Sequence, residues 1–455
     1  MTPVAPPGGE IAVLGLGKSG TAVTRLMLSE GRRVYASDSG PSSAAAENAE
    51  KLKALGADAV SGSHDLERIA KASLVVVSPG IPPQAPPIRA AQAAGVPVIS
   101  EIEFALRYLQ SAKIIAVTGT NGKTTTTALI GHILRGLAVD AVDAGNIGTA
   151  LTEIALRKPP PQWIALEMSS FQLHDTPSLA PTVGVLTNLS PDHLDRYPSE
   201  TEYYADKALL FANATETSRW VVNADDDRSQ AMTANVRGRK HYFSITKRSD
   251  AFFDSETGQL MLLGQPLMDR RDLGLLGDHN VANALAAALA VHVADEKFQG
   301  ADALGKIRAA LAAFRPLSHR LEIVGEFNGV QWINDSKATN VSSTRVAVEG
   351  MQRPTILLLG GRHKGEPYTS LSDAIRKTVK HVLAYGEAAP EVEKDLAGVV
   401  PLDRLDGGFD EVVRRARELA SNGEAILLSP ACSSYDMFRN YEERGARFRE
   451  LAKEK

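Results

Sequence analysis

The residues with the clearest chemical signal form one loop, Thr118-Gly119-Thr120-Asn121-Gly122-Lys123-Thr124-Thr125. It lies between a strand-like run, Lys113 to Thr118, and a helix-like run, Thr126 to Leu134. A glycine-rich loop in this position surrounds phosphates with backbone N–H groups, places a lysine on the outer phosphates and puts a hydroxyl on Mg²⁺. Val117 replaces the first glycine of the common form, but the G-x-x-G-K-T core is present. We therefore predict ATP or GTP binding here, the alternative being a buried structural lysine.

Two further loops offer metal ligands beside this one. Glu167 follows the strand-like WIAL, and Asp192-His193 follow VGVLTN. A nucleotide-bound Mg²⁺ takes only one or two protein carboxylates, so a single glutamate is enough. A single glutamate or histidine at the end of a strand is usually a capping residue in a loop, but the position of these residues after parallel strands, beside the phosphate-type loop, favours metal binding. Asn146, between Gly145 and Ile147-Gly148, suits either a ligand contact or a turn.

An earlier glycine loop, Gly15-Leu16-Gly17-Lys18-Ser19-Gly20, also separates a strand-like run from a helix-like one. Asp38 ends the next strand eighteen residues after Gly20. This is the pattern of a dinucleotide site, in which the glycines let a diphosphate approach and the acid accepts a ribose hydroxyl. NAD and a nucleotide sugar such as a UDP-sugar both fit, and a purely structural turn is the alternative. Ser78-Pro79-Gly80 either adds donors at the same edge or forms a plain turn.

Three loops near the C-terminus follow strand-like runs: Asn334 to Asn340, Gly360 to Gly365 and Ser429 to Ser434. Together with Arg320 and Lys364 they could hold an anionic small substrate and ATP phosphates, although each alone suits a cap and a turn. No histidine can be assigned as a partner for Cys432, which disfavours a nucleophilic thiol. The pattern around Lys207, TEYYADKALLFANA, is typical of a solvated helix lysine.

Short β-branched runs alternating with alanine-rich helical stretches predict an α/β protein built of βαβ units. We expect three domains, 1–111, 112–316 and 317–455: a Rossmann-like domain, a central P-loop domain and a second Rossmann-like domain. Hairpin turns are predicted at Thr257-Gly258 and at Asn328-Gly329.

The composition excludes several classes of protein. The chain of 455 residues has 50 Lys and Arg against 54 Asp and Glu, so its net charge is 50 − 54 = −4. Without a basic face, neither nucleic acid nor an anionic membrane is expected as the main partner. The single cysteine cannot form an intrachain disulfide. No secretory signal and no apolar run of about 18 residues is present, so we predict a cytoplasmic protein.

Two nucleotide-type loops in separate domains indicate ATP chemistry on a carrier-bound small molecule. Serine-hydrolase, HExxH and zinc-cysteine motifs are absent from the sequence. At this point the chain resembles the Mur ligase family, through TGTNGKTT, GNIG, EMSSFQL, DHLDRY, NDSKATN and SPACSSYDMFRNYEERG. These segments lie in the second and third expected domains, and the resemblance as a whole runs through all three.

The resemblance implies an ATP-dependent, ADP-forming ligase of peptidoglycan precursor synthesis. Its N-terminal domain would bind UDP-N-acetylmuramoyl-L-alanine, its central domain ATP, and its C-terminal domain D-glutamate. ATP would phosphorylate the L-alanyl carboxylate, and the D-glutamate amine would then attack the acyl phosphate. The resemblance also implies two Mg²⁺ ions, replaceable by Mn²⁺, and a monomer.

Site residues follow from the resemblance position by position. The ATP site would comprise Gly119, Thr120, Asn121, Gly122, Lys123, Thr124 and Thr125, with Asn280 and Asn283 at the adenine and Arg320, Asp335 and Lys337 from the C-terminal domain. Metal would be held by Thr124, Glu167, His193 and Lys207, the last as a CO₂-derived carbamate, which replaces the solvated-lysine interpretation. The UDP-substrate site would comprise Lys18, Ser19, Asp38, Ser39, Ser78, Asn146, Ser169 and His193. The D-glutamate pocket would comprise Thr339, Lys364, Ser434, Tyr435 and Tyr441, in which Tyr441 replaces a phenylalanine and Tyr435 a leucine of some relatives.

Three kinds of alternative function remain open at the level of sequence: another ligase of the same reaction type, an oxidoreductase and a non-catalytic regulator. A sister ligase for diaminopimelate or lysine is one, although the Asp-Asn-Pro-Arg of the diaminopimelate form does not occur; a folylpolyglutamate synthase would lack the roughly 110 residues before the P-loop. An NAD-dependent oxidoreductase fused to an ATPase would need a nicotinamide at the first loop. A non-catalytic regulator is disfavoured because Lys123, Glu167, Lys207 and Asp335 are all present.

Overall fold

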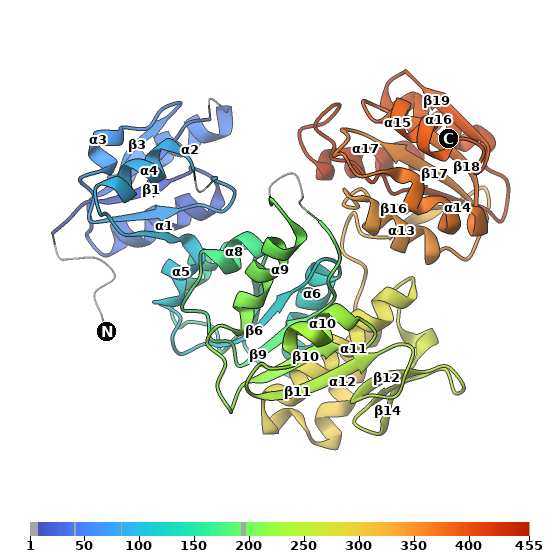
Figure 1. The fold of residues 1–455 in the computed structure, drawn as a ribbon, viewed down its shortest axis with the longest axis horizontal. Helices are drawn as coiled ribbons and strands as arrows, with labels where there is room; N and C mark the ends of the chain where they lie inside the picture. Colours follow the sequence, from blue (N-terminus) through green and yellow to red (C-terminus); the bar gives the residue numbers. More distant parts are fainter. Residues whose placement is uncertain (1–7, 41, 83, 193–196, 455) are drawn as a thin grey trace.

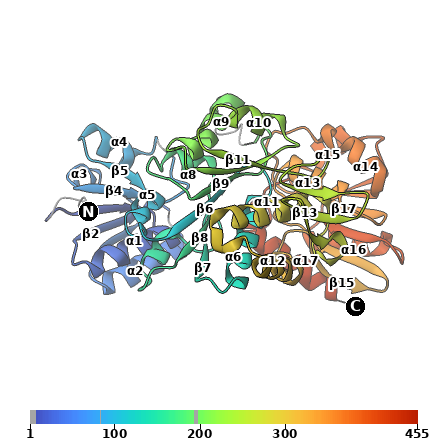
Figure 2. The same ribbon diagram turned by 90° about the horizontal axis from the view of Figure 1, so that it is seen from below.

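The computed structural model describes residues 8–40, 42–82, 84–192 and 197–454. Within these residues the strands form sheets of five, nine and six strands, in that order along the chain. Figure 1 shows the three bodies: the N-terminal one in blue and the C-terminal one in orange and red stand on either side of the green and yellow central one. Seen from below, the central body lies between the other two (Figure 2). Helices pack on all three sheets, which confirms the predicted α/β class.

The first sheet is parallel throughout, in the order β3-β2-β1-β4-β5. In β1 (Ile11–Leu14), Ile11 and Val13 pack against α1 and α2, whereas Ala12 and Leu14 pack against α3 and α4. Because helices cover both faces, the whole of β1 is buried and apolar. The other elements are β2 (Val34–Asp38), β3 (Asp58–Ser61), β4 (Leu74–Val77), β5 (Val98–Ser100), α1 (Lys18–Ser29), α2 (Ser43–Ala54), α3 (Leu66–Ile69), α4 (Pro86–Ala93) and α5 (Glu101–Leu106).

The central sheet has the order β14-β13-β12-β11-β10-β9-β6-β8-β7, and only β13 and β14 join it antiparallel. Its strands are β6 (Lys113–Thr118), β7 (Ala141–Gly145), β8 (Trp163–Glu167), β9 (Val183–Leu186), β10 (Arg219–Asn223), β11 (Arg239–Ser244), β12 (Ala251–Asp254), β13 (Gln259–Leu262) and β14 (Gln265–Asp269). Its helices are α6 (Lys123–Gly136), α7 (Leu151–Ala155), α8 (Ser170–His174), α9 (Glu200–Ala208), α10 (Asp227–Thr233), α11 (Asp278–Ala294) and α12 (Ala301–Ala313). The alanine-rich α11 is almost wholly buried because it packs against the sheet and α6, and residues of α12 belong to the same apolar cluster.

The C-terminal sheet has the order β15-β16-β20-β17-β18-β19 and is parallel except for the β15–β16 pair. That pair is joined by the predicted hairpin, where Asn328 and Gly329 have φ angles of +52° and +74°. The predicted hairpin at Thr257-Gly258 joins β12 and β13. The elements are β15 (Glu322–Phe327), β16 (Val330–Asn334), β17 (Thr355–Gly360), β18 (Val379–Tyr385), β19 (Leu402–Leu405), β20 (Ala425–Leu428), α13 (Val341–Glu349), α14 (Ser372–Thr378), α15 (Ala389–Leu396), α16 (Phe409–Leu419) and α17 (Tyr441–Lys453).

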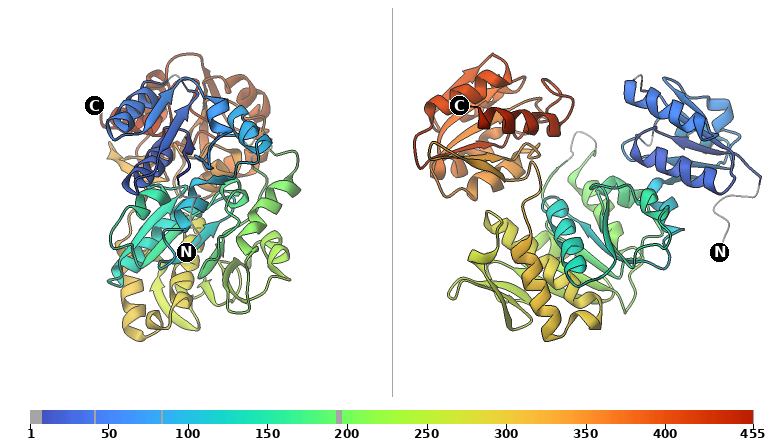
Figure 3. Two further views of the ribbon diagram at one scale, coloured as in Figure 1. Left: turned by 90° about the vertical axis from the view of Figure 1, so that its left-hand side faces the viewer. Right: turned by 180° about the vertical axis from the view of Figure 1, so that it is seen from behind.

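The bodies are connected by short segments. At the start of α5, Glu101 Oε1 accepts a hydrogen bond from Thr152 N at 2.6 Å, which ties α5, the helix before the first connection, to α7. From behind, the segment after α12 leads directly into the C-terminal body (Figure 3). The domain limits near residues 111 and 316 fall in these connections and remain predictions. No helix in the described part of the chain is both long and apolar enough to span a bilayer.

Candidate active site

The central phosphate-type loop leaves β6 and enters α6. Gly119 and Gly122 have φ angles of +145° and +80°, which L side chains rarely adopt. A Cβ at Gly119 would lie 2.0 Å from Thr187 Oγ1, and one at Gly122 would lie 2.3 Å from Asn283 Oδ1. Both positions therefore require glycine. The first N–H groups of α6 lack intrahelical partners, which makes this helix start suitable for a phosphate.

Lys123, at the start of α6, folds back into the loop. Its Nζ donates to the carbonyl oxygens of Gly119 at 3.0 Å and Thr120 at 2.7 Å. Burial lowers the pKa of Lys123, and the charges of Glu167 and Asp192 oppose that shift. The two hydrogen bonds hold the Lys123 amine at the loop, which is the position required of a lysine that contacts phosphate.

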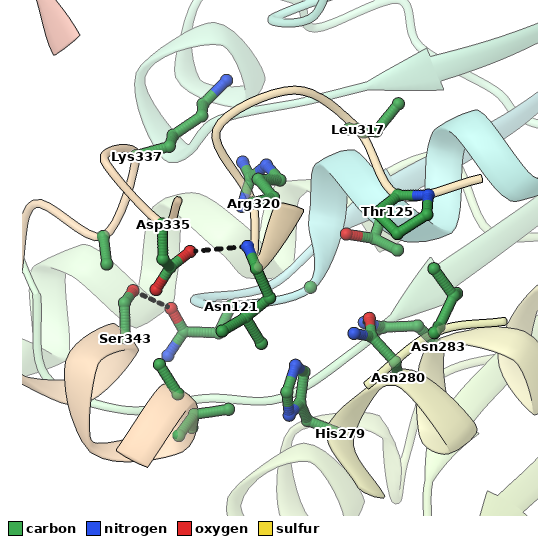
Figure 4. A pocket seen from close by; sticks show the side chains of 17 residues that line it. Asn121, Thr125, His279, Asn280, Asn283, Leu317, Arg320, Asp335, Lys337 and Ser343 are labelled. Atoms are coloured by element: carbon green, nitrogen blue, oxygen red, sulfur yellow. Dashed lines mark hydrogen bonds between the residues drawn. The ribbon is translucent and has the colours of Figure 1, made fainter. Parts of the chain in front are cut away.

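A pocket lies between this loop, α11 and the C-terminal body (Figure 4). Arg320 Nη2 donates to Thr124 Oγ1 at 2.6 Å, and Ser343 Oγ donates to Asn121 Oδ1 at 3.0 Å. The structure thus brings together candidate ATP-site residues from the central and the C-terminal body. Those that line this one pocket are Asn121, Gly122, Thr125, Asn280, Asn283, Arg320, Asp335 and Lys337.

The two asparagines of α11 form the opposite wall. Asn280 Nδ2 donates to Leu276 O at 2.7 Å, and Asn283 Nδ2 donates to Asn280 Oδ1 at 3.1 Å. Thr126 Oγ1 donates to Asn283 Oδ1 at 3.2 Å, so α6 and α11 fix both side chains. A rigid pair of amides suits hydrogen bonding to the edge of a nucleobase.

Asp335 and Lys337 follow β16 on the C-terminal side. Asp335 accepts hydrogen bonds from Leu321 N at 3.2 Å and from Ser429 Oγ at 2.8 Å, and burial raises its pKa to about 7. Burial, and then the charge of Arg320, lowers the pKa of Lys337 to about 8, and its Nζ lies 4.9 Å from the centre of the Tyr441 ring. The loop therefore contributes both a carboxyl and an ammonium group to the lining of the pocket.

Glu167 has a free buried oxygen that fits a metal ion. Oε1 accepts from Asn146 Nδ2 at 2.9 Å, whereas Oε2 is buried with no hydrogen-bond partner among the described residues. A buried unpaired carboxylate oxygen is costly, and a hard cation would satisfy it. No group of three or more His, Cys, Asp or Glu side chains in the described ranges forms a metal cluster. His193 lies outside the described residues.

Lys207 of α9 is not a solvated helix lysine, so the interpretation from pattern alone is wrong. Only 1% of the residue is exposed, and Nζ donates to Gly119 O at 2.7 Å. Nζ also lies 4.5 Å from the centre of the Tyr203 ring. Burial, and then the positive charge of Lys123, lowers the pKa of Lys207 well below its usual value. α9 therefore delivers an amine to the phosphate-type loop itself.

The candidates for the amino-acid pocket lie on loops of the C-terminal sheet. Lys364 Nζ lies 3.5 Å from Thr339 Oγ1, and Ser434 is buried. Tyr435 is 63% exposed and Tyr441 is partly buried at the start of α17. The sequence did not single out Arg444, which is fully buried and donates to Ser336 O at 2.8 Å and Cys432 O at 3.1 Å. Arg444 lies in the segment SPACSSYDMFRNYEERG, but its spacing from Ser336 and Cys432 gives no sign that the three residues are in contact.

The first glycine loop is closed by Asp38 and Ser78. Asp38 Oδ2 accepts from Leu16 N at 2.9 Å, and Oδ1 accepts from Gly40 N at 2.7 Å. Ser78 Oγ is buried against Gly15 and Gly20 with no partner in the part of the chain that the structure describes. Lys18 and Ser39 are exposed and Ser19 is half-buried at the same sheet edge. In the central body Ser169 caps α8, its Oγ accepting from Gln172 N at 3.2 Å.

Comparison with known proteins places this geometry in a family. Three family models match the chain: "Mur ligase MurD-like, N-terminal domain" over residues 9–100, "Mur ligase middle domain" over 117–291 and "Mur ligase, glutamate ligase domain" over 319–432. A curated relative from Myxococcus xanthus (strain DK1622), named UDP-N-acetylmuramoylalanine--D-glutamate ligase, is 40% identical and the match covers 98% of each chain. The chain belongs to the Mur ligase family. A relative of the same name from Anaeromyxobacter dehalogenans (strain 2CP-C) is also 40% identical, again over 98% of each chain.

Solved Mur ligases share the fold. The UDP-N-acetylmuramate-alanine ligase of Thermotoga maritima superposes with a TM-score of 0.62 at 19% identity, covering 98% of this chain and 99% of that one. MurF of Acinetobacter baumannii has a TM-score of 0.62 at 18% identity, covering 92% and 91%. The similarity over nearly the whole chain shows that this protein and these ligases share one fold.

His279, which is partly buried beside the two asparagines, predicts a pH effect on stability. Burial, and then the charge of Arg270, lowers its pKa from 6.5 to about 4. The neutral ring therefore contributes stability above pH 6.5 that is lost as the pH falls towards 4. Between pH 7 and pH 5 the melting temperature should fall about 2–4 °C more for the wild type than for His279→Gln. Equal falls in a calorimetric comparison would show that His279 does not stay neutral in the folded chain.

Proposed function

We propose that the chain is an ATP-dependent, ADP-forming ligase that joins D-glutamate to UDP-N-acetylmuramoyl-L-alanine in peptidoglycan precursor synthesis in the cytoplasm. The single observation that carries the proposal is the pocket in which the P-loop and α11 meet Arg320, Asp335 and Lys337 of the C-terminal body. The names of the relatives at 40% identity support the choice of substrates. We assign the nucleotide substrate to the first body, ATP to the second and the amino acid to the third, with the limits 1–111, 112–316 and 317–455, in a monomer.

The reaction has two steps. An oxygen of the L-alanyl carboxylate attacks the γ-phosphorus of ATP, the bond to the β–γ bridging oxygen breaks, and ADP leaves. The free amine of D-glutamate then attacks the carbonyl carbon of the acyl phosphate, the nitrogen loses a proton, and phosphate leaves with the electron pair of the C–O bond. Phosphorylation makes the carboxyl carbon a good electrophile, because phosphate is a much better leaving group than oxide.

The chain contributes position and charge to this reaction. Lys123, Arg320 and Lys337 are the cations that we assign to the phosphates of ATP, and Asn280 and Asn283 to its adenine. Phosphoryl transfer needs little covalent chemistry from the protein, so fixed cations supply most of the rate. The D-glutamate carboxylates are assigned to Thr339, Lys364 and Ser434, with Tyr435 and Tyr441 at the rim.

We assign Mg²⁺ to Thr124 and Glu167, whose buried Oε2 lacks a partner. A second ion is assigned to His193 and to a carbamate formed from CO₂ on Lys207, whose burial favours the neutral amine that this reaction needs. When bound, these ions would neutralise phosphate charge. The UDP moiety and muramoyl group are assigned to Lys18, Ser19, Asp38, Ser39, Ser78, Asn146 and Ser169.

Phosphate release tests the acceptor directly. The protein is incubated with ATP, Mg²⁺ and UDP-N-acetylmuramoyl-L-alanine, and D-Glu, L-Glu, L-Lys or meso-diaminopimelate is supplied in separate tubes. We expect release, and a D-glutamyl adduct by mass spectrometry, only with D-Glu. Turnover with another amino acid would move the chain to a sister ligase, and no release in any tube would remove the ligase assignment.

Domain closure is a further expected result. Most of the residues assigned to the UDP substrate lie on the first body and the amino-acid residues lie on the third, so joining the substrates requires these bodies to approach (Figure 1). Adding an ATP analogue, Mg²⁺ and the UDP substrate should therefore reduce the radius of gyration measured by small-angle scattering. A profile unchanged by all three ligands would contradict closure.

A further inference from the structure

His64 lies at the carboxyl edge of the first sheet and uses one of its two ring nitrogens. It follows β3, whose neighbour β2 ends at Asp38. Nδ1 lies 2.9 Å from Ser37 Oγ. No hydrogen bond to Nε2 is found within the described ranges, and the residue is only partly buried. A polar ring atom is therefore available at the edge where the UDP substrate is proposed to bind.

The loop that carries His64 is held in place by β2. Gly62 N donates to Asp38 O at 2.7 Å, and Asp65 N donates to Tyr35 Oη at 2.8 Å. Asp65 Oδ1 also caps α3 by accepting from Arg68 N at 3.0 Å. Since backbone contacts fix the residues on either side of His64, the ring direction is set before any ligand arrives.

The Ser37 contact selects one tautomer. Burial lowers the pKa of His64, although the charge of Asp38 opposes the shift, so the ring is neutral at pH 7. Ser37 is fully buried, and its hydroxyl has no other hydrogen-bond partner in the described part of the chain. If Nδ1 donated to Ser37, the hydroxyl proton would be buried and unpaired, which is costly. We therefore assign the Ser37 hydroxyl as the donor, which leaves an N–H on Nε2.

We propose that the Nε2–H of His64 donates a hydrogen bond to an oxygen of the uridine half of the UDP-linked substrate. The inference rests on the proposed function. The glycine loop for the diphosphate follows β1 and the acid for the ribose ends β2, so the nucleoside extends in the direction of β3, about 5 Å further on. Asp38 can only accept, and both of its oxygens already receive backbone N–H groups. His64 supplies the donor that a uracil carbonyl or ribose oxygen requires.

The test is UDP binding by the full chain, measured by calorimetry. In His64→Asn the amide still reaches Ser37 but the outward N–H is lost, so the Kd for UDP should rise about 3- to 10-fold. His64→Gln, whose longer amide reaches the Nε2 position, should recover most of the affinity. Ser63→Ala, an exposed neighbour in the same loop, is the control and should bind like the wild type. The KM values for ATP and D-glutamate should not change in any of the three.

A second ligand, 2′-deoxy-UDP, separates the two oxygens. If His64 contacts the ribose 2′ oxygen, His64→Asn and wild type should bind 2′-deoxy-UDP equally. If His64 contacts uracil or another ribose oxygen, His64→Asn should bind 2′-deoxy-UDP about 3- to 10-fold more weakly than the wild type does. Equal binding and weaker binding of 2′-deoxy-UDP both support the proposal, and they identify different oxygens. A His64→Asn protein that melts like the wild type and binds UDP within twofold of it would overturn the proposal. Wild-type protein that does not bind UDP at all would refute the UDP-substrate site instead.

Discussion

Lys123→Met is expected to lower kcat for ATP-dependent ligation by about 10³-fold. Methionine keeps much of the side-chain length but removes the ammonium, which lies inside the loop, 2.7 Å from Thr120 O and 3.0 Å from Gly119 O. In the proposed reaction negative charge builds on oxygens of the transferred phosphoryl group, and a positioned cation stabilises that charge. The measurement is the rate of phosphate release at saturating ATP, D-glutamate and UDP substrate.

The matched control is Lys113→Met at the other end of β6. The Lys113 side chain is 52% exposed and pairs with Asp295 at 2.6 Å. Because an exposed pair contributes only about 0–1 kcal/mol, kcat should stay within twofold of the wild type. Both variants should bind the UDP substrate normally, which shows that the chain is folded. A Lys123→Met protein with more than a tenth of the wild-type kcat would show that Lys123 does not act on the ATP phosphates.

Much of the fold is predictable because the core strands are short apolar runs. β6, β8 and β9 coincide with the strand-like runs Lys113 to Thr118, WIAL and VGVLTN, since both faces of these strands are covered. The sequence does not predict β3, β5, β7, β11 and β19, and all of these except β11 are edge strands. An edge strand has fewer neighbours and tolerates polar residues such as Asp58 and Asp143, so the apolar signal is lost.

The candidate site also contains some residues that the sequence predicts and others that it does not. The two glycine loops are visible in the sequence because phosphate binding needs consecutive residues at fixed spacing. Arg444 is not, because its role depends on Ser336 and Cys432, which only the folded chain brings to it. The same holds for the contact between Asn121 and Ser343, 222 residues apart. Long-range contacts of this kind leave no local pattern.

Lys207 shows most clearly what sequence pattern alone cannot give. Its helix α9 is rich in charged residues, among them Glu200, Glu202 and Asp206, so the pattern predicts an exposed lysine, whereas the fold places its Nζ on Gly119 O. Only the family resemblance indicated another role. In the carbamylation that we propose, burial favours the neutral amine, which is the form that attacks CO₂. In that attack nitrogen binds the carbon of CO₂ and loses a proton, and a cationic side chain becomes an anionic carbamate.

Lys207→Arg is expected to lower kcat at least about 100-fold, because arginine keeps a positive charge where the carbamate would place a negative one. If Lys207 acted simply as a cation, Lys207→Arg would retain much of the activity, so the variant separates the two roles. Wild-type protein in ¹³C-bicarbonate should show a carbamate carbon signal by NMR that Lys207→Arg lacks. Removing dissolved CO₂ should slow the wild type, and added bicarbonate should restore it. A fully active Lys207→Arg protein together with no carbamate signal in the wild type would show that α9 delivers a plain ammonium to the loop.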